Sequence, residues 1–120
     1  MGRSPQAGAG SPAKTVKSVS LSPEAVQELS EAVSWYETRQ PGLAIRFLQE
    51  IDQAQQAIQS RPQSFPRLAN MAVDLAIRRA LLPRFPYALV FFELPTEIRV
   101  LAIAHAKRHP DYWLNRLQAT

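Results

Sequence analysis

The side chains best suited to chemistry are basic and lie in the second half of the sequence. From 60 to 120 there are nine lysine and arginine residues against four acidic ones, a net charge of +5, whereas 14–59 has four against six, a net charge of −2. Guanidinium and ammonium groups bind phosphates and carboxylates. The second half is therefore expected to attract an anionic partner, either nucleic acid or an acidic protein segment.

Two histidines are the candidate proton-transfer groups. His105 follows an apolar run, and as a general base it would need a partner carboxylate and a substrate hydroxyl within reach. The pattern favours a simpler interpretation, a histidine at a strand end that is hydrogen-bonded to backbone or to the C-terminal segment. His109 precedes Pro110 and is expected on the surface.

No metal or cofactor site is predicted. The two histidines are four residues apart without clustered carboxylates, and the chain has no cysteine. No glycine-rich phosphate loop or serine nucleophile motif occurs in the sequence.

The adjacent pair Arg78-Arg79 lies on an expected strand, so one side chain points to each face of the sheet. Because buried arginines are almost always paired, the one facing the helices is expected to pair with a helix acid such as Glu31 or Glu37. The other arginine is a candidate contact for a partner protein.

Four further basic residues could form one patch near the end of the sheet: Arg84, Lys107, Arg108 and Arg116. A solvated surface without function is the alternative for such scattered charges. The aromatic pairs Trp35-Tyr36 and Tyr112-Trp113 could stack on nucleic-acid bases. Their helical spacing instead favours packing in the core or at its rim.

The first half of the sequence supplies a strand and two helices. Residues 1–13 read as a flexible extension before a domain at 14–120, and 15–21 as a short strand rich in β-branched residues. Ser22 followed by proline and glutamate marks a helix start, and Val26, Leu29, Val33 and Tyr36 follow the spacing of one buried stripe. Pro41-Gly42 ends this helix, and a second amphipathic helix runs to Arg61-Pro62.

The second half supplies three more strands and a closing segment. Short apolar or alternating runs at 77–82, 87–94 and 98–104 are separated by proline-containing turns, which is typical of a small antiparallel sheet. Residues 111–118 are expected to form one or two closing helical turns. The predicted fold class is α+β: a strand, an antiparallel helical hairpin on one face of a small antiparallel sheet, and a short C-terminal helix.

Membrane insertion and secretion are not expected. The opening residues lack the apolar run of a signal peptide, and no stretch approaches the length of a membrane span. Together with the absence of cysteine, this favours a cytoplasmic protein.

Several strings, taken in order, resemble the RelE/ParE superfamily of toxins from type II toxin–antitoxin systems. The first two helices carry Glu31-Ala-Val-Ser-Trp-Tyr-Glu37 and Pro41-Gly-Leu-Ala44, and Phe65-Pro66 follows them. The second half carries Arg78-Arg79, Leu82 to Tyr87, Val100 to His105, and then Arg108, Pro110, Tyr112-Trp113 and Arg116. The resemblance covers about residues 16–117.

The resemblance implies a compact α+β toxin that inhibits growth, takes part in plasmid stabilisation and is blocked by a cognate antitoxin. Two branches differ in activity. RelE-like members cut mRNA on the ribosome without a metal, whereas ParE-like members act on DNA gyrase. In the RelE-like pattern an arginine often follows the tyrosine of the middle strand, but here Tyr87 is followed by Ala88. This departure favours the ParE-like branch.

Three hypotheses stay open from the sequence. The leading one is a ParE-like toxin that binds DNA gyrase. The second is a ribosome-dependent endoribonuclease with Lys107, Arg108 and Tyr112 as its catalytic residues, and the third is a member that binds antitoxin but has lost toxicity. The antitoxin is expected to present an acidic, amphipathic segment. The candidate residues for binding target or antitoxin are Arg78, Arg79, Arg84, His105, Arg108, Trp113 and Arg116.

Overall fold

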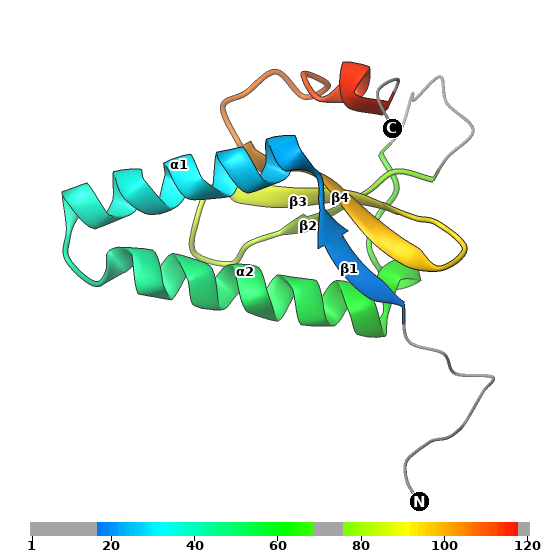
Figure 1. Cartoon of the computed structure of the whole chain (residues 1–120), viewed down its shortest axis with the longest axis horizontal. Helices are drawn as coiled ribbons and strands as arrows, with labels where there is room; N and C mark the ends of the chain where they lie inside the picture. The colour runs from blue at the N-terminus through cyan, green and yellow to red at the C-terminus, as the bar shows by residue number, and fades with distance from the viewer. Residues whose placement is uncertain (1–16, 69–75, 118–120) are drawn as a thin grey trace, which may run out of the picture.

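A computed structural model describes residues 17–68 and 76–117, which form a four-stranded sheet with two helices on one face (Figure 1). The proposed N-terminal extension lies outside the described residues. The sheet order is β1-β4-β3-β2. Its strands are β1 (Ser18–Leu21), β2 (Arg78–Leu81), β3 (Tyr87–Glu93) and β4 (Glu97–His105).

The predicted α+β fold is confirmed, and the sheet is mixed because β1, for which the sequence predicted no partner, adds a parallel strand to the predicted antiparallel sheet. Strands β2, β3 and β4 pair antiparallel as predicted, but β1 pairs parallel with β4, with Ser18 opposite Glu97 and Leu21 opposite Val100. The reason is topological. After the helical hairpin the chain enters β2 at the opposite edge of the sheet from β1, and the meander from β2 to β4 then brings β4 next to β1. In the chain, 75 residues separate Leu21 from Glu97.

Helix α1 (Pro23–Arg39) begins where the sequence predicts. The Ser22 side chain accepts a hydrogen bond from the Ala25 N–H, and proline occupies the first turn. The predicted stripe is confirmed at Tyr36, which is buried, and at Leu29 and Val33, which are partly buried against the core, but Val26 is half exposed. Ala25 and Ala32 are buried in addition, because small alanines let this helix lie close to the sheet.

Helix α2 (Leu43–Ser60) follows after the Pro41-Gly42 link. Gly42 has φ 88°, a left-handed conformation that glycine adopts without a Cβ penalty, and its N–H donates to the Glu37 carboxylate. The buried face of α2 includes Phe47, Ile51 and Ile58. A 3-10 turn, η3 (Pro62–Ser64), ends the hairpin.

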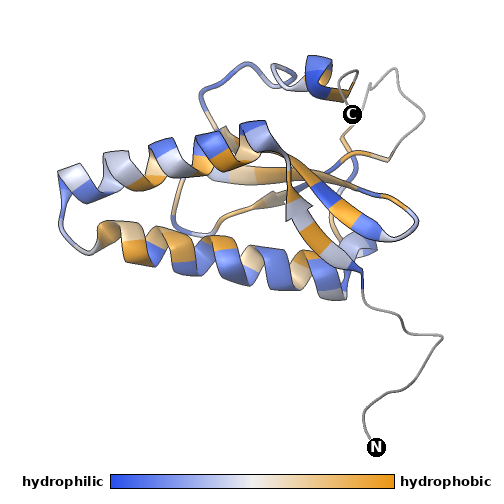
Figure 2. Ribbon diagram, viewed as in Figure 1, coloured by the Kyte–Doolittle hydropathy of each residue, from blue (hydrophilic) through white to orange (hydrophobic). Residues whose placement is uncertain are grey.

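Both faces of the sheet are buried, in two clusters. On the helix side, Leu89, Phe91, Val100 and Ile103 pack with the helices. On the other face, Val90, Phe92 and Leu101 pack with Trp113. The hydropathy colouring shows hydrophobic residues concentrated in the strands, whereas hydrophobic and hydrophilic residues alternate along the helices (Figure 2).

The chain after β4 closes the second face. The predicted closing helical turns are present as one short 3-10 turn, η4 (Leu114–Leu117). Trp113, 1% exposed, is the largest side chain of the second cluster. The aromatic pair Tyr112-Trp113 therefore packs as core, as the helical spacing favoured, and not as a stacking platform.

Candidate functional site

The candidate site is a groove of about 670 Å³ on the sheet face opposite the helices, which we call the sheet-face groove. Its floor includes Val90, Ala104 and the edge of Trp113. Arg79 and Arg108 stand at its rim. An apolar floor between two exposed guanidinium groups suits a ligand that is both apolar and anionic.

One side of this groove is the edge of the sheet. The segment after α2 covers the first part of β2, where Leu68 N–H donates to Ile77 C=O at 2.8 Å and Arg79 N–H donates to Pro66 C=O at 3.2 Å. Within residues 17–68 and 76–117, the segment after α2 makes no backbone hydrogen bond to β2 beyond Arg79, and Leu81 is 69% exposed. The rim of the groove is therefore formed partly by an exposed strand edge.

The prediction that one of the adjacent arginines pairs with a helix acid is wrong. Arg78 donates to the backbone carbonyls of Phe65, at 2.7 Å, and Gln63, at 3.4 Å. Backbone carbonyls of the link after α2 lie nearer than any helix carboxylate, so Arg78 fixes that link. Arg79 is exposed and lines the sheet-face groove.

His105 ends β4 at the boundary of the sheet-face groove and a smaller hollow of about 340 Å³ beside α1. Its Nδ1 accepts a hydrogen bond from the Lys107 N–H at 3.0 Å, and its ring packs edge-on against Tyr87 at 4.9 Å. This confirms the interpretation of a strand-end histidine bonded to backbone. His109 is exposed, as expected, and its imidazole contacts the Asp111 carboxylate.

Arg108 is exposed and lines both hollows, with its guanidinium 3.9 Å from the centre of the Tyr112 ring. Stacking on an aromatic face orients an arginine while leaving its N–H donors available. Lys107 is also exposed, next to it. Arg108 is therefore the candidate residue best placed to contact a partner.

Glu28, on α1, collects four hydrogen bonds that the sequence did not predict. It accepts from the Tyr112 hydroxyl at 2.5 Å, from the Arg116 guanidinium at 2.9 and 3.0 Å, and from the Ile103 N–H at 2.9 Å. We call Glu28, Tyr112 and Arg116 the Glu28 cluster. Burial, and then the hydrogen bond to Glu28, raise the pKa of the Tyr112 phenol well above its ordinary value.

The Glu28 cluster also closes the outer edge of β4. Strand β1 pairs with β4 only as far as Val100, so the later residues of β4 have no strand beyond them on that side within the described residues. The Ile103 N–H goes to Glu28, and the Leu101 carbonyl accepts from Ser22 and from Arg116. Side chains thus satisfy the backbone groups that a strand would otherwise pair.

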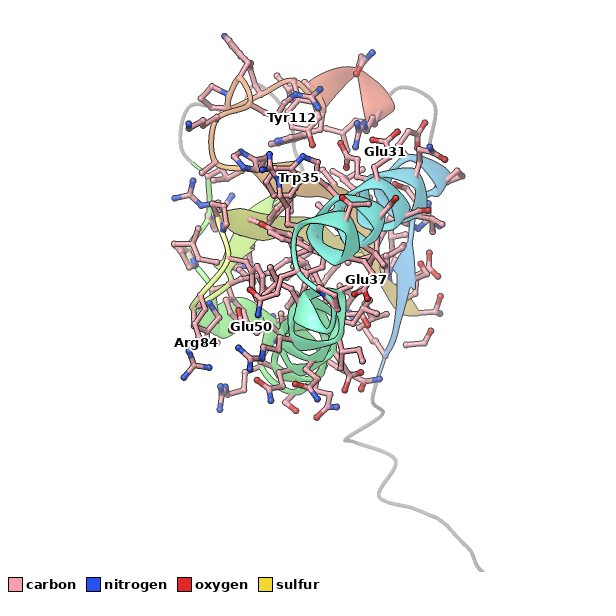
Figure 3. All side chains as sticks on the ribbon, turned by 90° about the vertical axis from the view of Figure 1, so that its left-hand side faces the viewer. Glu31, Trp35, Glu37, Glu50, Arg84 and Tyr112 are labelled. Atoms are coloured by element: carbon pink, nitrogen blue, oxygen red, sulfur yellow. The ribbon has the colours of Figure 1, made fainter. Side chains whose placement is uncertain are left out.

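The single basic patch expected from the sequence is not formed, because its members lie apart. Arg116 is held by Glu28, whereas Arg84 lies beside α2, where its backbone N–H donates to the Glu50 carboxylate at 3.1 Å. Figure 3 shows Tyr112 and Arg84 at opposite sides of the molecule. Lys107 and Arg108 alone of the four remain at the end of β4.

Of the candidate binding residues, the structure brings together Arg79, His105, Arg108 and Trp113 in the sheet-face groove. It places Arg78, Arg84 and Arg116 elsewhere. Trp113 forms part of the groove floor, and its side chain is buried.

Sequence reasoning missed two functional candidates, Glu28 and Glu50, because both lie off the apolar stripes of their helices. Their positions in sequence look like ordinary exposed helix acids, and only their contacts with the second half distinguish them.

Within the described residues there is neither a candidate metal centre nor a helix that could span a membrane. In the portions 17–68 and 76–117, no group of three or more histidine, cysteine, aspartate or glutamate side chains could hold a metal ion. Across the same portions, no helix combines the length and the apolar character that crossing a bilayer requires.

Comparison with known proteins agrees with the fold. The family described as the ParE toxin of the type II toxin–antitoxin system parDE matches residues 19–110. A solved structure described as the chromosomal ParDE toxin–antitoxin system from P. aeruginosa is similar in fold, with a TM-score of 0.64 and 20% sequence identity over 77% of this chain and 98% of that one. Among curated proteins, none matches. Because the family match spans most of the chain and agrees with the helical pair on the sheet, this chain belongs to the ParE toxin family of type II toxin–antitoxin systems.

Proposed function

We propose that this toxin acts in the cytoplasm by binding DNA gyrase and thereby stops growth, and that a cognate antitoxin neutralises it. The carrying observation is the sheet-face groove, which offers a recognition surface without a catalytic set. Its apolar floor and the rim cations Arg79 and Arg108 support binding of a protein segment.

The same groove is our proposed docking site for the antitoxin. An amphipathic acidic segment would lay apolar side chains against the exposed Leu81 and Pro86 of the groove and set carboxylates against the rim arginines. Bidentate pairs between arginine and carboxylate would fix its register. This proposal gives a role to two exposed arginines, Arg79 and Arg108, that line an apolar hollow in the basic second half of the chain.

The structure supports protein binding over RNA cleavage at two points. Strand β3 carries no basic residue, and Ala88 is buried at the position where RelE-like nucleases often have an arginine. The Tyr112 hydroxyl and the Arg116 guanidinium are bound to Glu28. Metal-free cleavage of a phosphodiester needs several basic groups around one phosphate, and losing one such group costs about 10²–10³ in rate.

Gyrase assays test the leading proposal. Purified toxin is expected to bind gyrase in a pull-down and to inhibit DNA supercoiling at micromolar concentration. Arg108→Ala should weaken both effects, and the exposed Arg61 provides a matched control through Arg61→Ala. If the wild-type toxin neither binds nor inhibits at these concentrations, gyrase is not the target.

Ribosome-dependent mRNA cleavage is the alternative, and Lys107 and Arg108 favour it because both are exposed at the end of β4. Primer extension on mRNA from cells that express the toxin distinguishes the two functions. Cuts linked to codons, present with wild-type toxin and absent with Arg108→Ala, would establish the nuclease. We expect no such cuts.

A further inference from the structure

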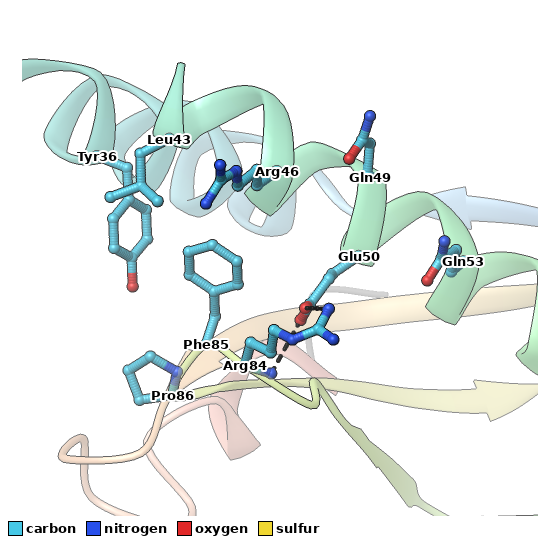
Figure 4. Close-up of a pocket in the computed structure, with 9 residues that line it drawn as sticks. All are labelled: Tyr36, Leu43, Arg46, Gln49, Glu50, Gln53, Arg84, Phe85 and Pro86. Atoms are coloured by element: carbon cyan, nitrogen blue, oxygen red, sulfur yellow. Dashed lines mark hydrogen bonds and ion pairs between the residues drawn. The ribbon is translucent and has the colours of Figure 1, made fainter. Parts of the chain in front are cut away.

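A third hollow, of about 640 Å³, lies on the helix side of the molecule between α2 and the turn that joins β2 to β3 (Figure 4). We call it the Glu50 pocket. Tyr36 and Phe85 form its aromatic walls, and Arg46 and Arg84 stand at its mouth. It lies on the other side of the sheet from Trp113, and it shares only Phe85 and Pro86 with the lining of the sheet-face groove.

Glu50 is the unusual member of this pocket. Its side chain is only 8% exposed, and it is the one buried acidic residue of the described chain. Oε1 accepts the Arg84 N–H at 3.1 Å, but Oε2 lies 3.8 Å from the Arg84 guanidinium, beyond hydrogen-bond distance. Burying a carboxylate costs free energy unless its oxygens are hydrogen-bonded or paired with a cation. Oε2 is therefore a hydrogen-bond acceptor that is only partly satisfied.

The Arg84 side chain is a weak partner for this oxygen. It is 86% exposed, so solvent screens its charge, and an ion pair of that kind contributes little to stability. Its guanidinium can therefore leave Oε2 at small cost. The position of the Arg84 guanidinium near Oε2 nevertheless indicates that the pocket suits a guanidinium group.

The aromatic walls fit the same ligand. Phe85 lies between Tyr36 and Glu50 in the close-up, with its ring 5.0 Å from that of Tyr36 (Figure 4). Aromatic faces attract cations, and arginine stacks on them while donating hydrogen bonds in the plane of its guanidinium. A carboxylate floor with aromatic walls is thus complementary to a planar cation.

We propose that the Glu50 pocket binds an arginine side chain of a partner protein, which displaces the Arg84 guanidinium from Oε2. The incoming guanidinium stacks on Phe85 and donates to Glu50. Arginine is common among the residues that anchor protein interfaces in buried pockets. The site is independent of the proposed gyrase and antitoxin functions, and its test uses neither protein.

The test is an NMR titration of the ¹⁵N-labelled full chain with N-acetyl-L-arginine amide, which presents one guanidinium. Saturating shifts are expected at the backbone amides of Arg84 and Phe85, with a Kd of about 1 mM for so small a ligand. Glu50→Gln should weaken binding by about tenfold, because it removes the charge but keeps an oxygen for the Arg84 N–H. Asp52→Asn, at an exposed acid of the same helix, should leave the Kd unchanged.

Two further variants distinguish this proposal from an anion site by whether they strengthen or weaken binding of the arginine probe. Arg84→Ala and Arg46→Gln each remove a cation that competes with or repels the ligand, so each should tighten binding by about threefold. An anion held between these arginines would be lost in both variants. The proposal is overturned if these variants weaken binding, if N-acetyl-L-aspartate amide or inorganic phosphate produces the shifts in place of the arginine probe, or if no shift saturates. The two arginine variants decide the matter even if Glu50→Gln does not fold.

Discussion

Glu28→Ala should destabilise the toxin more than any other change to an acidic side chain on its helices. The substitution removes four hydrogen bonds at once and leaves the Arg116 guanidinium and the Ile103 N–H without their shared acceptor. Breaking a buried ion pair by deleting one member costs about 3–5 kcal/mol. Since the side chains of Glu28 and Arg116 keep 14% and 15% exposure, we expect the lower end, about 3 kcal/mol.

The measurement is chemical and thermal unfolding of the purified chain. For a domain of this size, 3 kcal/mol corresponds to a fall in Tm of about 12 °C. Hydrogen exchange at the Ile103 amide should accelerate in the variant, because that N–H loses its acceptor. Glu28→Gln should cost less, because its amide oxygen still accepts one of the four hydrogen bonds.

The matched control is Glu31→Ala, one turn further along α1. Glu31 is exposed, and within the described residues its carboxylate accepts a hydrogen bond from the Gln27 side chain alone, so its loss should cost less than about 0.5 kcal/mol. If Glu28→Ala costs no more than Glu31→Ala, the Glu28 cluster does not hold the C-terminal segment, and the reasoning fails.

Three shorter predictions follow. Burial raises the pKa of all three tyrosines above the ordinary value near 10, so their contribution to stability is complete below pH 10 and is lost as the pH rises further. Absorbance at 295 nm should therefore show no phenolate before alkaline unfolding begins. A phenol that ionises near pH 10 in the folded chain would contradict this. Trp113→Ala should cost about 3–5 kcal/mol in urea unfolding, whereas the half-exposed Trp35 should tolerate alanine at less than about 1 kcal/mol; equal costs would refute the core assignment. Arg108→Ala should weaken antitoxin binding by about tenfold in calorimetry at low salt, and Arg61→Ala should not; equal affinities for the two variants would place the antitoxin elsewhere.

Local signals in the sequence predicted the elements of the fold well. Ser22 and the proline after it begin α1, Gly42 takes the left-handed conformation that the Pro-Gly link suggests, and the three strands of the second half pair antiparallel as expected. These features depend on residues close together in the chain, where capping and turn chemistry act directly.

Features that depend on distant residues were not predictable. The parallel pairing of β1 with β4 and the four hydrogen bonds of Glu28 join residues that lie 75 or more positions apart. Helical periodicity marks Glu28 and Glu50 as polar positions but cannot say which polar positions the rest of the chain will cover. The same limit explains why the predicted basic patch does not form, since Arg84 and Arg116 bind these two acids on different sides of the molecule.

The Glu28 cluster also sets the order in which a newly made chain can mature. A ribosome produces Glu28 early, and its partners Tyr112 and Arg116 emerge 84 and 88 residues later. Until then the helical hairpin and the antiparallel pairs β2-β3 and β3-β4 can form from neighbouring residues without the cluster, and β1 waits for β4. We therefore expect translation to deliver an immature protein first, which leaves the cell a short interval between making this toxin and being exposed to it.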